Sequence, residues 1–230
     1  MSSRSPVPAA ERPGESLRLI EVKVAENQEI APGIFRVAFP RPWDFFPGQT
    51  IALSTDPSIP ARYYSIASGC HDPVVEILYD LVPEGLLTPR MAGLGAGDTL
   101  LSSEPFGAFL DGDGASLWIA AGTGVAPFAS MARSGMVEDK TLVQGSRTLA
   151  GLYLRGYFSS VLGARYVPCC STESAAGVFS GRSTAWISSA ALPDAERVLL
   201  CGGSRMVVDA RDALIARGVP FERVISEIYF

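Results

Sequence analysis

Histidine and grouped cysteines are both scarce in this sequence. The only histidine among the 230 residues is His71, and nothing near it forms a Ser-His-Asp or Cys-His arrangement, so catalysis of that kind is not expected. The four cysteines, Cys70, Cys169, Cys170 and Cys201, have no C-x-x-C spacing. Neither a zinc site nor an iron–sulfur cluster is therefore indicated, because both need grouped ligands.

Long apolar runs and excess basic charge are also lacking. No stretch is long and apolar enough to cross a bilayer. Residues 1–16 contain arginine, proline and serine without a continuous apolar core, so we expect a flexible arm rather than a signal peptide. The net charge of −5 and the pI near 5.0 disfavour a nucleic-acid partner. These features predict a cytoplasmic protein without a membrane span.

Two patterns divide the chain, and its length and 47% apolar content suit two modest domains with buried cores. In residues 17–112 we predict strands at 17–25, 33–39, 49–54, 62–68, 74–82 and 98–103, with a polar turn between 25 and 33, which indicates a β-sandwich or small barrel. In residues 113–230 apolar runs alternate with helical segments, the pattern of a parallel α/β sheet. Its strands are predicted at 117–121, 141–144, 164–167, 197–201 and 223–227, with helices ending at 133 and spanning 150–161, 184–190 and 205–217.

The segment Arg62-Tyr63-Tyr64-Ser65-Ile66-Ala67-Ser68 has more chemistry than a short strand needs. Strand alternation places Arg62 and Tyr64 on one face, so a guanidinium suited to phosphate and a flat ring point the same way. The structural alternative is a surface arginine beside core tyrosines. Downstream, Thr88 fits the N-cap of a short helix with Pro89 at its first position, and such a helix start can hold a phosphate.

Three strand ends in the second half have nucleotide-binding features. Gly122-Thr123-Gly124-Val125-Ala126-Pro127-Phe128 partly matches G-x-G-x-x-G, with Pro127 in place of a glycine. The next strand ends at Gly145-Ser146-Arg147, where an arginine suits a 2′-phosphate and no carboxylate is available for a ribose diol. Gly202-Gly203-Ser204 ends a later strand. All three would lie along the carboxyl edge of the sheet, where α/β proteins bind ligands.

The order of these motifs resembles the ferredoxin–NADP reductase family, in its compact bacterial branch, over residues 17–230. Arg62-Tyr63-Tyr64-Ser65 is similar to the family's R-x-Y-S flavin signature, and Gly85-Leu86-Leu87-Thr88 to its pyrophosphate loop. Residues 122–128 are similar to its pyridine-nucleotide loop. Cys201-Gly202-Gly203 and Glu227-Ile228-Tyr229 resemble the two segments that flank the nicotinamide.

The resemblance implies an N-terminal antiparallel β-barrel that holds FAD and a C-terminal α/β parallel-sheet domain that binds NADP(H). Arg62 would contact the FAD pyrophosphate, Tyr64 would stack on the isoalloxazine, and Ser65 would approach the reactive flavin nitrogen, which requires the strand to end or bend there. The implied catalytic residues are Ser65, Cys201 and Glu227. The implied FAD-binding residues are Arg62, Tyr63, Tyr64, Ser65, Gly85, Leu86, Leu87, Thr88, Thr123, Tyr229 and Phe230. The implied NADP-binding residues are Gly122, Gly124, Ser146, Arg147, Thr172, Arg182, Gly202 and Met206.

Some of these positions have a structural alternative. Cys201 also fits a small buried residue, and Glu227 also fits a solvated strand end. Bacterial relatives often carry a further arginine where this chain has Ser171-Thr172-Glu173, and Glu173 would repel a phosphate if it faced inward. We therefore expect a moderate preference for NADPH over NADH.

The resemblance implies a monomeric oxidoreductase that transfers hydride between NADPH and FAD, and single electrons between FAD and ferredoxin or flavodoxin. Exposed arginines such as Arg90 or Arg155 would form a local positive patch for that carrier. Two alternatives stay open. The chain could be an NAD(P)H-dependent flavin reductase, or a non-catalytic FAD-binding electron-transfer subunit of a larger complex.

Overall fold

The structure is a computed structural model, and it describes residues 17–229. The chain divides into two compact units, one ending at Leu110 and one beginning at Asp111. This division falls two residues before the expected boundary between residues 112 and 113. The predicted N-terminal arm and Phe230 lie outside the described residues.

The N-terminal unit consists of two antiparallel sheets and one short helix. The sheets have the strand orders β1-β7-β4-β5 and β2-β3-β6. The elements are β1 (Leu19–Lys23), β2 (Glu26–Ala31), β3 (Ile34–Pro40), β4 (Thr50–Ser54), β5 (Arg62–Ser65), β6 (Val74–Asp80), α1 (Thr88–Ala92) and β7 (Thr99–Ser103).

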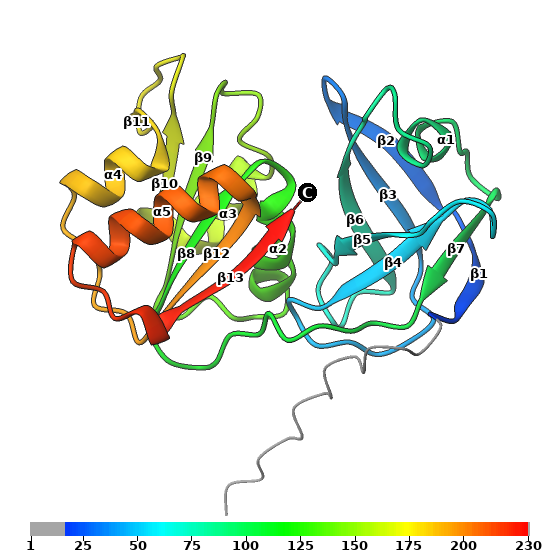
Figure 1. Cartoon of the computed structure of the whole chain (residues 1–230), viewed down its shortest axis with the longest axis horizontal. Coiled ribbons are helices and arrows are strands. Elements are labelled where there is room, and N and C mark those ends of the chain that lie inside the picture. The colour runs from blue at the N-terminus through cyan, green and yellow to red at the C-terminus, as the bar shows by residue number, and fades with distance from the viewer. Residues whose placement is uncertain (1–16, 230) are drawn as a thin grey trace, which may run out of the picture. The chain divides into compact units, whose positions relative to one another are not determined.

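Backbone contacts on two sides close these sheets into a barrel (Figure 1). On one side Ile66, directly after β5, forms a bridge with Ile77 in β6. On the other side the chain passes from β1 straight into β2, and the Ala25 amide donates to the Ala38 carbonyl in β3 at 2.8 Å. The predicted N-terminal antiparallel barrel is confirmed.

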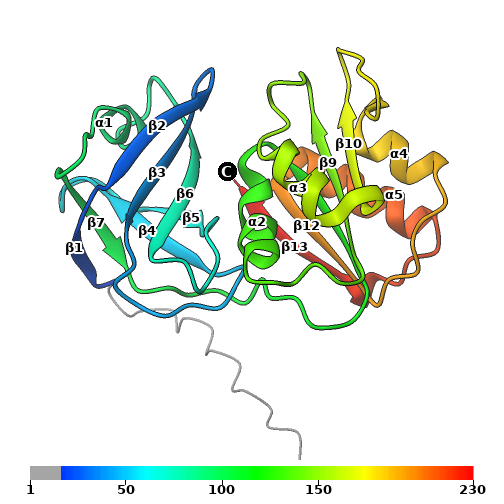
Figure 2. The same cartoon turned by 180° about the vertical axis from the view of Figure 1, so that it is seen from behind.

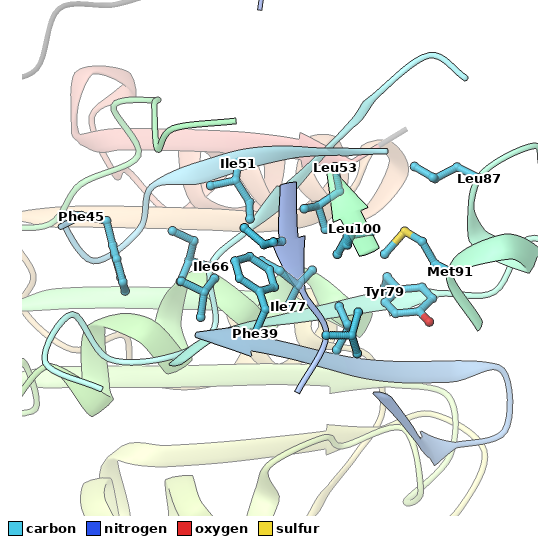
Figure 3. Close-up of a cluster of buried hydrophobic side chains, with 14 residues drawn as sticks. Phe39, Phe45, Ile51, Leu53, Ile66, Ile77, Tyr79, Leu87, Met91 and Leu100 are labelled. Carbon is cyan, nitrogen blue, oxygen red and sulfur yellow. The ribbon is translucent and has the colours of Figure 1, made fainter. Parts of the chain in front are cut away.

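The barrel core is filled by every second residue of its strands (Figure 3). Phe39, Ile51, Leu53 and Ile77 are fully buried there. Burying an aliphatic or aromatic side chain of this size stabilises the fold by about 1.5–3 kcal/mol. Leu87, which directly precedes α1, and Met91, within α1, belong to the same cluster. The helix is thereby anchored to the barrel.

The prediction of a turn between residues 25 and 33 is wrong, because β2 occupies most of that stretch. Its sequence, ENQEIA, is polar and mainly exposed. β2 lies at the edge of its sheet, where hydrogen bonds to β3 form the strand without an apolar face of its own. Apolar alternation therefore could not indicate it.

The C-terminal unit has a six-stranded, fully parallel sheet in the order β11-β10-β9-β8-β12-β13. The predicted parallel α/β domain is confirmed. The strands are β8 (Ser116–Ala121), β9 (Lys140–Ser146), β10 (Tyr166–Cys170), β11 (Phe179–Ser180), β12 (Arg197–Gly203) and β13 (Val224–Tyr229). The helices are α2 (Ala126–Arg133), α3 (Arg155–Leu162), α4 (Ser183–Ser189) and α5 (Ser204–Ala216), with 3-10 turns η1 (Gly122–Val125), η2 (Gly163–Arg165) and η3 (Phe221–Arg223).

Helices cover both faces of this sheet. α4 and α5 lie on one face (Figure 1), and α2 and α3 lie on the other (Figure 2). In α5, Val207, Ala210 and Leu214 recur at helical spacing and are buried in the sheet's core cluster. On the opposite face Trp118 stacks on Phe128 with ring centroids 5.4 Å apart. The strand order reverses at β8, and such a switch point is where α/β sheets bind nucleotides.

The helix predicted at 150–161 begins later than expected, at Arg155. Leu154 has a φ of +59°, a left-handed conformation that cannot continue a helix toward the N-terminus. Residues 147–154 form turns instead, and the Gln144 side chain donates to the Tyr153 carbonyl at 3.1 Å. The third strand also differs, because it extends to Cys170, and the predicted loop after it contains the short β11.

A buried ion pair fixes the first turn of the C-terminal unit. Lys140 Nζ lies 3.2 Å from Asp111 Oδ2, and both side chains are almost fully buried. The ammonium also donates to the carbonyl oxygens of Gly112 and Gly114, each at 2.5 Å. Trp118 Nε1 donates to the same carboxylate at 2.7 Å. Residues 111–114 therefore fold around one cation.

Within residues 17–229 no helix combines the length and the apolar content needed to cross a bilayer.

Candidate functional site

β5 places Arg62 and Tyr64 on the same face, as alternation predicts. In the register with β4, Arg62 is opposite Leu53 and Tyr64 is opposite Ile51, and both partners belong to the barrel core. Arg62 lies where the strand leaves the core and is exposed. Among residues 17–229 it has no carboxylate within salt-bridge distance. An exposed guanidinium without an internal partner is suited to bind phosphate.

The Tyr64 ring is half-buried against the barrel core. It meets Tyr79 edge-on, with ring centroids 6.4 Å apart and an interplanar angle of 74°. Burial raises the pKa of Tyr64 to about 12, partly opposed by the charge of Arg62 and assisted by that of Asp80. The phenol is therefore neutral at physiological pH. A flat neutral ring held in place by the core is suited to stacking.

Tyr63 and Ser65 occupy the other face of β5. Tyr63 is 62% exposed and packs edge-on against Phe106, with ring centroids 5.1 Å apart. Ser65 is buried, and its Oγ lies 3.5 Å from Thr50 Oγ1. The strand ends at Ser65, as the expected role of this residue requires.

The seam between β5 and β6 is only partly paired. β5 is the edge of one sheet and β6 is the edge of the other, and the two meet at the bridge between Ile66 and Ile77. Toward Arg62 and Asp80, within the described residues, no ladder joins the two edges. Tyr64 and Asp80 still interact electrostatically, so they lie near each other. The cation and the ring of β5 are thus at an open seam of the barrel.

The segment between β6 and α1 is an ordered loop. The Gly85 amide donates to the Val82 carbonyl at 2.8 Å, and the Thr88 hydroxyl accepts a hydrogen bond from the Val82 amide at 2.9 Å. The expected N-cap role of Thr88 is wrong: Leu87 is the N-cap and Thr88 begins the helix, because its hydroxyl is used by the loop. Within residues 17–229 the Leu86 and Leu87 amides have no acceptor, so both can donate to an anion.

Asn27 holds the end of α1 in place, and its role was missed at the sequence level. Its side-chain amide donates to the Met91 and Leu94 carbonyls at 2.8 and 3.0 Å, and it accepts a bond from the Tyr79 hydroxyl at 3.1 Å. Asn27 thus ties the end of α1 to the tyrosine that contacts Tyr64. No local pattern predicts these bonds, since they join residues more than fifty positions apart.

Glycines at the carboxyl edge of the second sheet permit close backbone packing. A Cβ on Gly124 would overlap the Cys201 carbonyl and lie 2.6 Å from the Gly202 Cα, so η1 packs directly on the end of β12. Gly122 has a φ of +58°, and neither Gly122 nor Gly203 has an atom within 4 Å of the position of a Cβ. The ends of β8 and β12 thus leave bare backbone at the switch point, which suits a nucleotide phosphate.

Cys201, Glu227 and Tyr229 form a cluster at the same edge. In the parallel register Cys201 is opposite Glu227, with Sγ 4.0 Å from Glu227 Oε1. Complete burial and, second, the charge of Glu227 raise the pKa of the Cys201 thiol well above its ordinary value, while a bond with the Tyr229 side chain lowers it. The thiol is therefore neutral and does not act as a nucleophile. Met206, on the first turn of α5, packs against Gly202.

A second group of predicted nucleotide-binding residues follows β9, β10 and β11. Arg147 is exposed, and its carbonyl accepts bonds from the Thr172 amide at 3.0 Å and the Thr172 hydroxyl at 2.5 Å. Arg182, also exposed, follows β11, and the neighbouring Gly181 amide donates to the Cys170 carbonyl at 2.8 Å. Cys170 is opposite Ser146 in the sheet. The structure thus brings Ser146, Arg147, Thr172 and Arg182 to one edge.

A hollow of about 500 Å³ lies at the other end of this sheet, lined by residues 191–195, 217–220, Leu117, Val198 and Arg223. It is adjacent to the amino ends of β8 and β12. Nucleotides bind α/β sheets at the carboxyl ends, so this hollow is not where a nucleotide is expected. Thr123 lies buried in η1 at that edge.

Comparison with known proteins identifies relatives of this chain, although no protein-family model matches it. Ferredoxin–NADP reductase A of Sorangium cellulosum is 31% identical over 186 residues, which cover 68% of this chain and 67% of that protein. The flavodoxin/ferredoxin–NADP reductase of Shigella flexneri is 32% identical over 217 residues, covering 82% and 87%. The reductase subunit of an aromatic O-demethylase from Amycolatopsis is 32% identical, and the chain spans 53% of its length.

A solved structure shows the same fold. The ferredoxin–NADP⁺ reductase of Neisseria gonorrhoeae, with bound FAD and NADP, superposes with a TM-score of 0.83 at 20% identity, over 94% of this chain and all of that one. Sequence relatives and fold thus agree. The chain belongs to the ferredoxin–NADP reductase family of oxidoreductases.

Proposed function

We propose that this chain is a FAD-dependent reductase that takes hydride from NADPH and delivers single electrons to a flavodoxin or a ferredoxin. The observation that carries the proposal is the pair on β5: an exposed Arg62 without an internal partner beside a half-buried, neutral Tyr64. A barrel does not need this pair in order to fold. Family membership at about 30% identity supports the proposal.

The residues of the N-terminal unit fit FAD. Arg62 and the amides of Leu86 and Leu87, which have no acceptor among residues 17–229, would bind the pyrophosphate. The pyrophosphate carries two negative charges, and a guanidinium and backbone amides are suitable donors for it. Tyr64 would stack on the flavin ring, and Ser65, beside Thr50, would donate a hydrogen bond to the ring edge. Gly85 permits the tight turn, because a Cβ there would lie 3.0 Å from the Val82 carbonyl oxygen. When bound, FAD supplies hydride acceptance and one-electron release.

The residues of the C-terminal unit fit a nicotinamide coenzyme. The glycine backbones at the ends of β8 and β12 would approach the pyrophosphate, and Thr123 would contribute from η1. Cys201 would exclude water as a neutral thiol, and Glu227 would bind the carboxamide. Tyr229 and Phe230 stay proposed as FAD-binding residues, as the family resemblance implies, and they would move when nicotinamide binds.

Arginine placement supports NADPH as the electron donor. Arg147 directly follows β9 and Arg182 lies two residues after β11, the two strands that flank β10, so we propose that their side chains converge on one 2′-phosphate. Ser146 would add a hydroxyl donor at the same edge, and Thr172, whose hydroxyl already donates to the Arg147 carbonyl, would hold the Arg147 loop in place. Among the described residues no carboxylate ends β9 to bind a ribose diol.

The choice of electron carrier rests on the relatives, which are named for both ferredoxin and flavodoxin. Arg90 is exposed and retains donors beyond its bond to the Leu86 carbonyl. Arg155 is only partly exposed and donates to the Ala176 carbonyl, so a positive patch that includes it stays a prediction. A monomeric state and a cytoplasmic location stay predictions.

A second candidate is a reductase component that delivers electrons to an oxygenase. The similarity to the O-demethylase reductase subunit, at 32% identity, favours it. The flavin reductase alternative is weaker. A flavin reductase releases its flavin, whereas Arg62 and the amides of Leu86 and Leu87 would retain FAD.

The test is reduction of purified flavodoxin and ferredoxin by NADPH with the FAD-loaded protein, at low and high salt. We expect reduction of at least one carrier, slowed by salt. Reduction of free flavin without either carrier would favour the flavin reductase. Failure with both carriers and with free flavin would reject the proposal in favour of the oxygenase partner or the electron-transfer subunit.

A further inference from the structure

Glu173 lies between the two arginines assigned to the 2′-phosphate. It follows β10, which separates β9 from β11 in the sheet, and those strands lead to Arg147 and Arg182. Its side chain is not turned away from the site: Glu173 Oε2 accepts a hydrogen bond from the Leu149 amide at 2.7 Å. Leu149 is two residues after Arg147, in the same loop.

Two contacts hold the carboxylate at this place. The loop after β9 is bound to the loop after β10 through Thr172, which donates twice to the Arg147 carbonyl, and through Glu173 at Leu149. Within residues 17–229 neither Glu173 nor Arg147 is in a salt bridge. The negative charge is thus fixed beside the Arg147 loop, with no cation within salt-bridge distance among residues 17–229.

The Glu173 carboxylate is close enough to Arg147 to act on a phosphate bound there. Thr172, the residue before Glu173, donates to the Arg147 carbonyl, so the Glu173 backbone lies next to the Arg147 backbone. Charges closer together than the Debye length, about 8 Å at physiological ionic strength, are only partly screened by salt, so a neighbouring carboxylate acts on a bound phosphate. A 2′-phosphate beside Ser146 and Arg147 would be repelled by Glu173, whereas a ribose hydroxyl would not.

We propose that Glu173 is a specificity-determining residue that restrains the preference for NADPH, by placing a fixed carboxylate beside the 2′-phosphate subsite. This rests on the proposed coenzyme function. The carboxylate fills an anion position on the Leu149 amide and opposes the two arginines. The chain therefore accepts NADH more readily than the two arginines alone would allow.

Calorimetry on the FAD-loaded protein separates charge from loop structure. The probes are adenosine 2′,5′-bisphosphate, which carries the 2′-phosphate, and 5′-AMP, which lacks it. Glu173→Gln removes the charge and keeps an oxygen for the Leu149 amide, whereas Glu173→Ala removes both. Glu138→Gln is the matched control, because Glu138 is exposed and precedes the amino end of β9.

We expect both Glu173 variants to bind the bisphosphate about three- to tenfold more tightly, the range for relief of a partly screened like-charge contact, with 5′-AMP affinity unchanged in Glu173→Gln. The gain should shrink at high salt, and Glu138→Gln should match the unmodified protein. An unchanged bisphosphate affinity in Glu173→Gln would overturn the proposal while 5′-AMP still bound. If Glu173→Gln left both affinities unchanged and only Glu173→Ala weakened the binding of both probes, Glu173 would anchor the loop without a charge effect, and the proposal would be overturned as well. If neither probe bound to any variant, the coenzyme site itself would be misplaced and the proposed function would fail too.

Discussion

Removing the Arg62 guanidinium tests the flavin site at the scale of one side chain. Arg62→Ala should weaken FAD retention by about ten- to a hundredfold, because each charge-assisted hydrogen bond contributes about 1.5–3 kcal/mol. Tyr63→Ala is the comparison variant: Tyr63 is the next residue and lies on the opposite face of β5, so its loss should weaken FAD retention less than the loss of Arg62. Bound FAD after gel filtration gives the measurement. Equal retention by the two variants would contradict the assignment of Arg62.

The arginines at the sheet edge test coenzyme choice at the same scale. Arg147→Ala or Arg182→Ala should raise the KM for NADPH by about tenfold or more while hardly changing that for NADH, because only NADPH offers a phosphate to the guanidinium. Arg211→Ala serves as the control, because Arg211 is on α5 and pairs with Asp212. Steady-state kinetics with both coenzymes decide the matter. Equal damage to both would place these arginines outside the 2′-phosphate subsite.

At the scale of elements, Gly124 tests the packing of η1 on β12. Gly124→Ala should force the two apart, because its Cβ would overlap backbone atoms that cannot move like a side chain. Overpacking of this kind costs about 1–3 kcal/mol, and we expect NADPH affinity to fall at least tenfold with FAD content unchanged.

The control for this change is Gly156→Ala. Gly156 lies inside α3, where nothing is within 4 Å of a Cβ, so alanine should be neutral or stabilising by about 0.5–1 kcal/mol. Normal NADPH binding by Gly124→Ala would show that the close packing of η1 on the end of β12 does not shape the NADPH site.

Elements with their own local signal were predictable from the sequence. β4 and β12 were expected within two residues of their observed ends, because each has a compact apolar run bounded by turns. β2 had no such signal, since an edge strand is formed by its neighbour's hydrogen bonds. The start of α3 depended on the left-handed Leu154, which no propensity predicts.

The site was predictable to a similar degree. Strand alternation predicted Arg62 and Tyr64 on one face, and the pairing of β5 with β4 confirms it. The N-cap expected at Thr88 failed because the Val82 amide competes for the same hydroxyl. Asn27 acts through contacts between residues far apart in sequence, so only the folded chain reveals its role. Glu173 was expected to repel a phosphate if it faced inward, and the folded chain adds its contact with the Leu149 amide.

At the scale of the whole molecule, the buried pair of Lys140 and Asp111 should control the stability of the C-terminal unit. Asp111→Asn leaves the buried ammonium without its counter-charge, and breaking such a pair costs about 3–5 kcal/mol. Asp113→Asn is the control, because Asp113 is exposed in the same turn. Urea unfolding followed by tryptophan fluorescence reports mainly on this unit, which contains Trp118 and Trp186.

FAD release in the same titration reports on the N-terminal unit, which should be unaffected by Asp111→Asn if the two units unfold independently. An Asp111→Asn midpoint equal to that of Asp113→Asn would show that the pair contributes little.

Anaerobic titration of the purified protein with NADPH, followed by the visible spectrum, tests the central claim most directly. We predict a yellow protein with about one FAD per chain, because one barrel provides one set of phosphate and ring contacts. One equivalent of NADPH should bleach the flavin band, and added flavodoxin or ferredoxin should restore it as electrons leave. A protein that stays colourless after reconstitution with FAD, or a bound flavin that neither NADPH nor NADH reduces, would contradict the account.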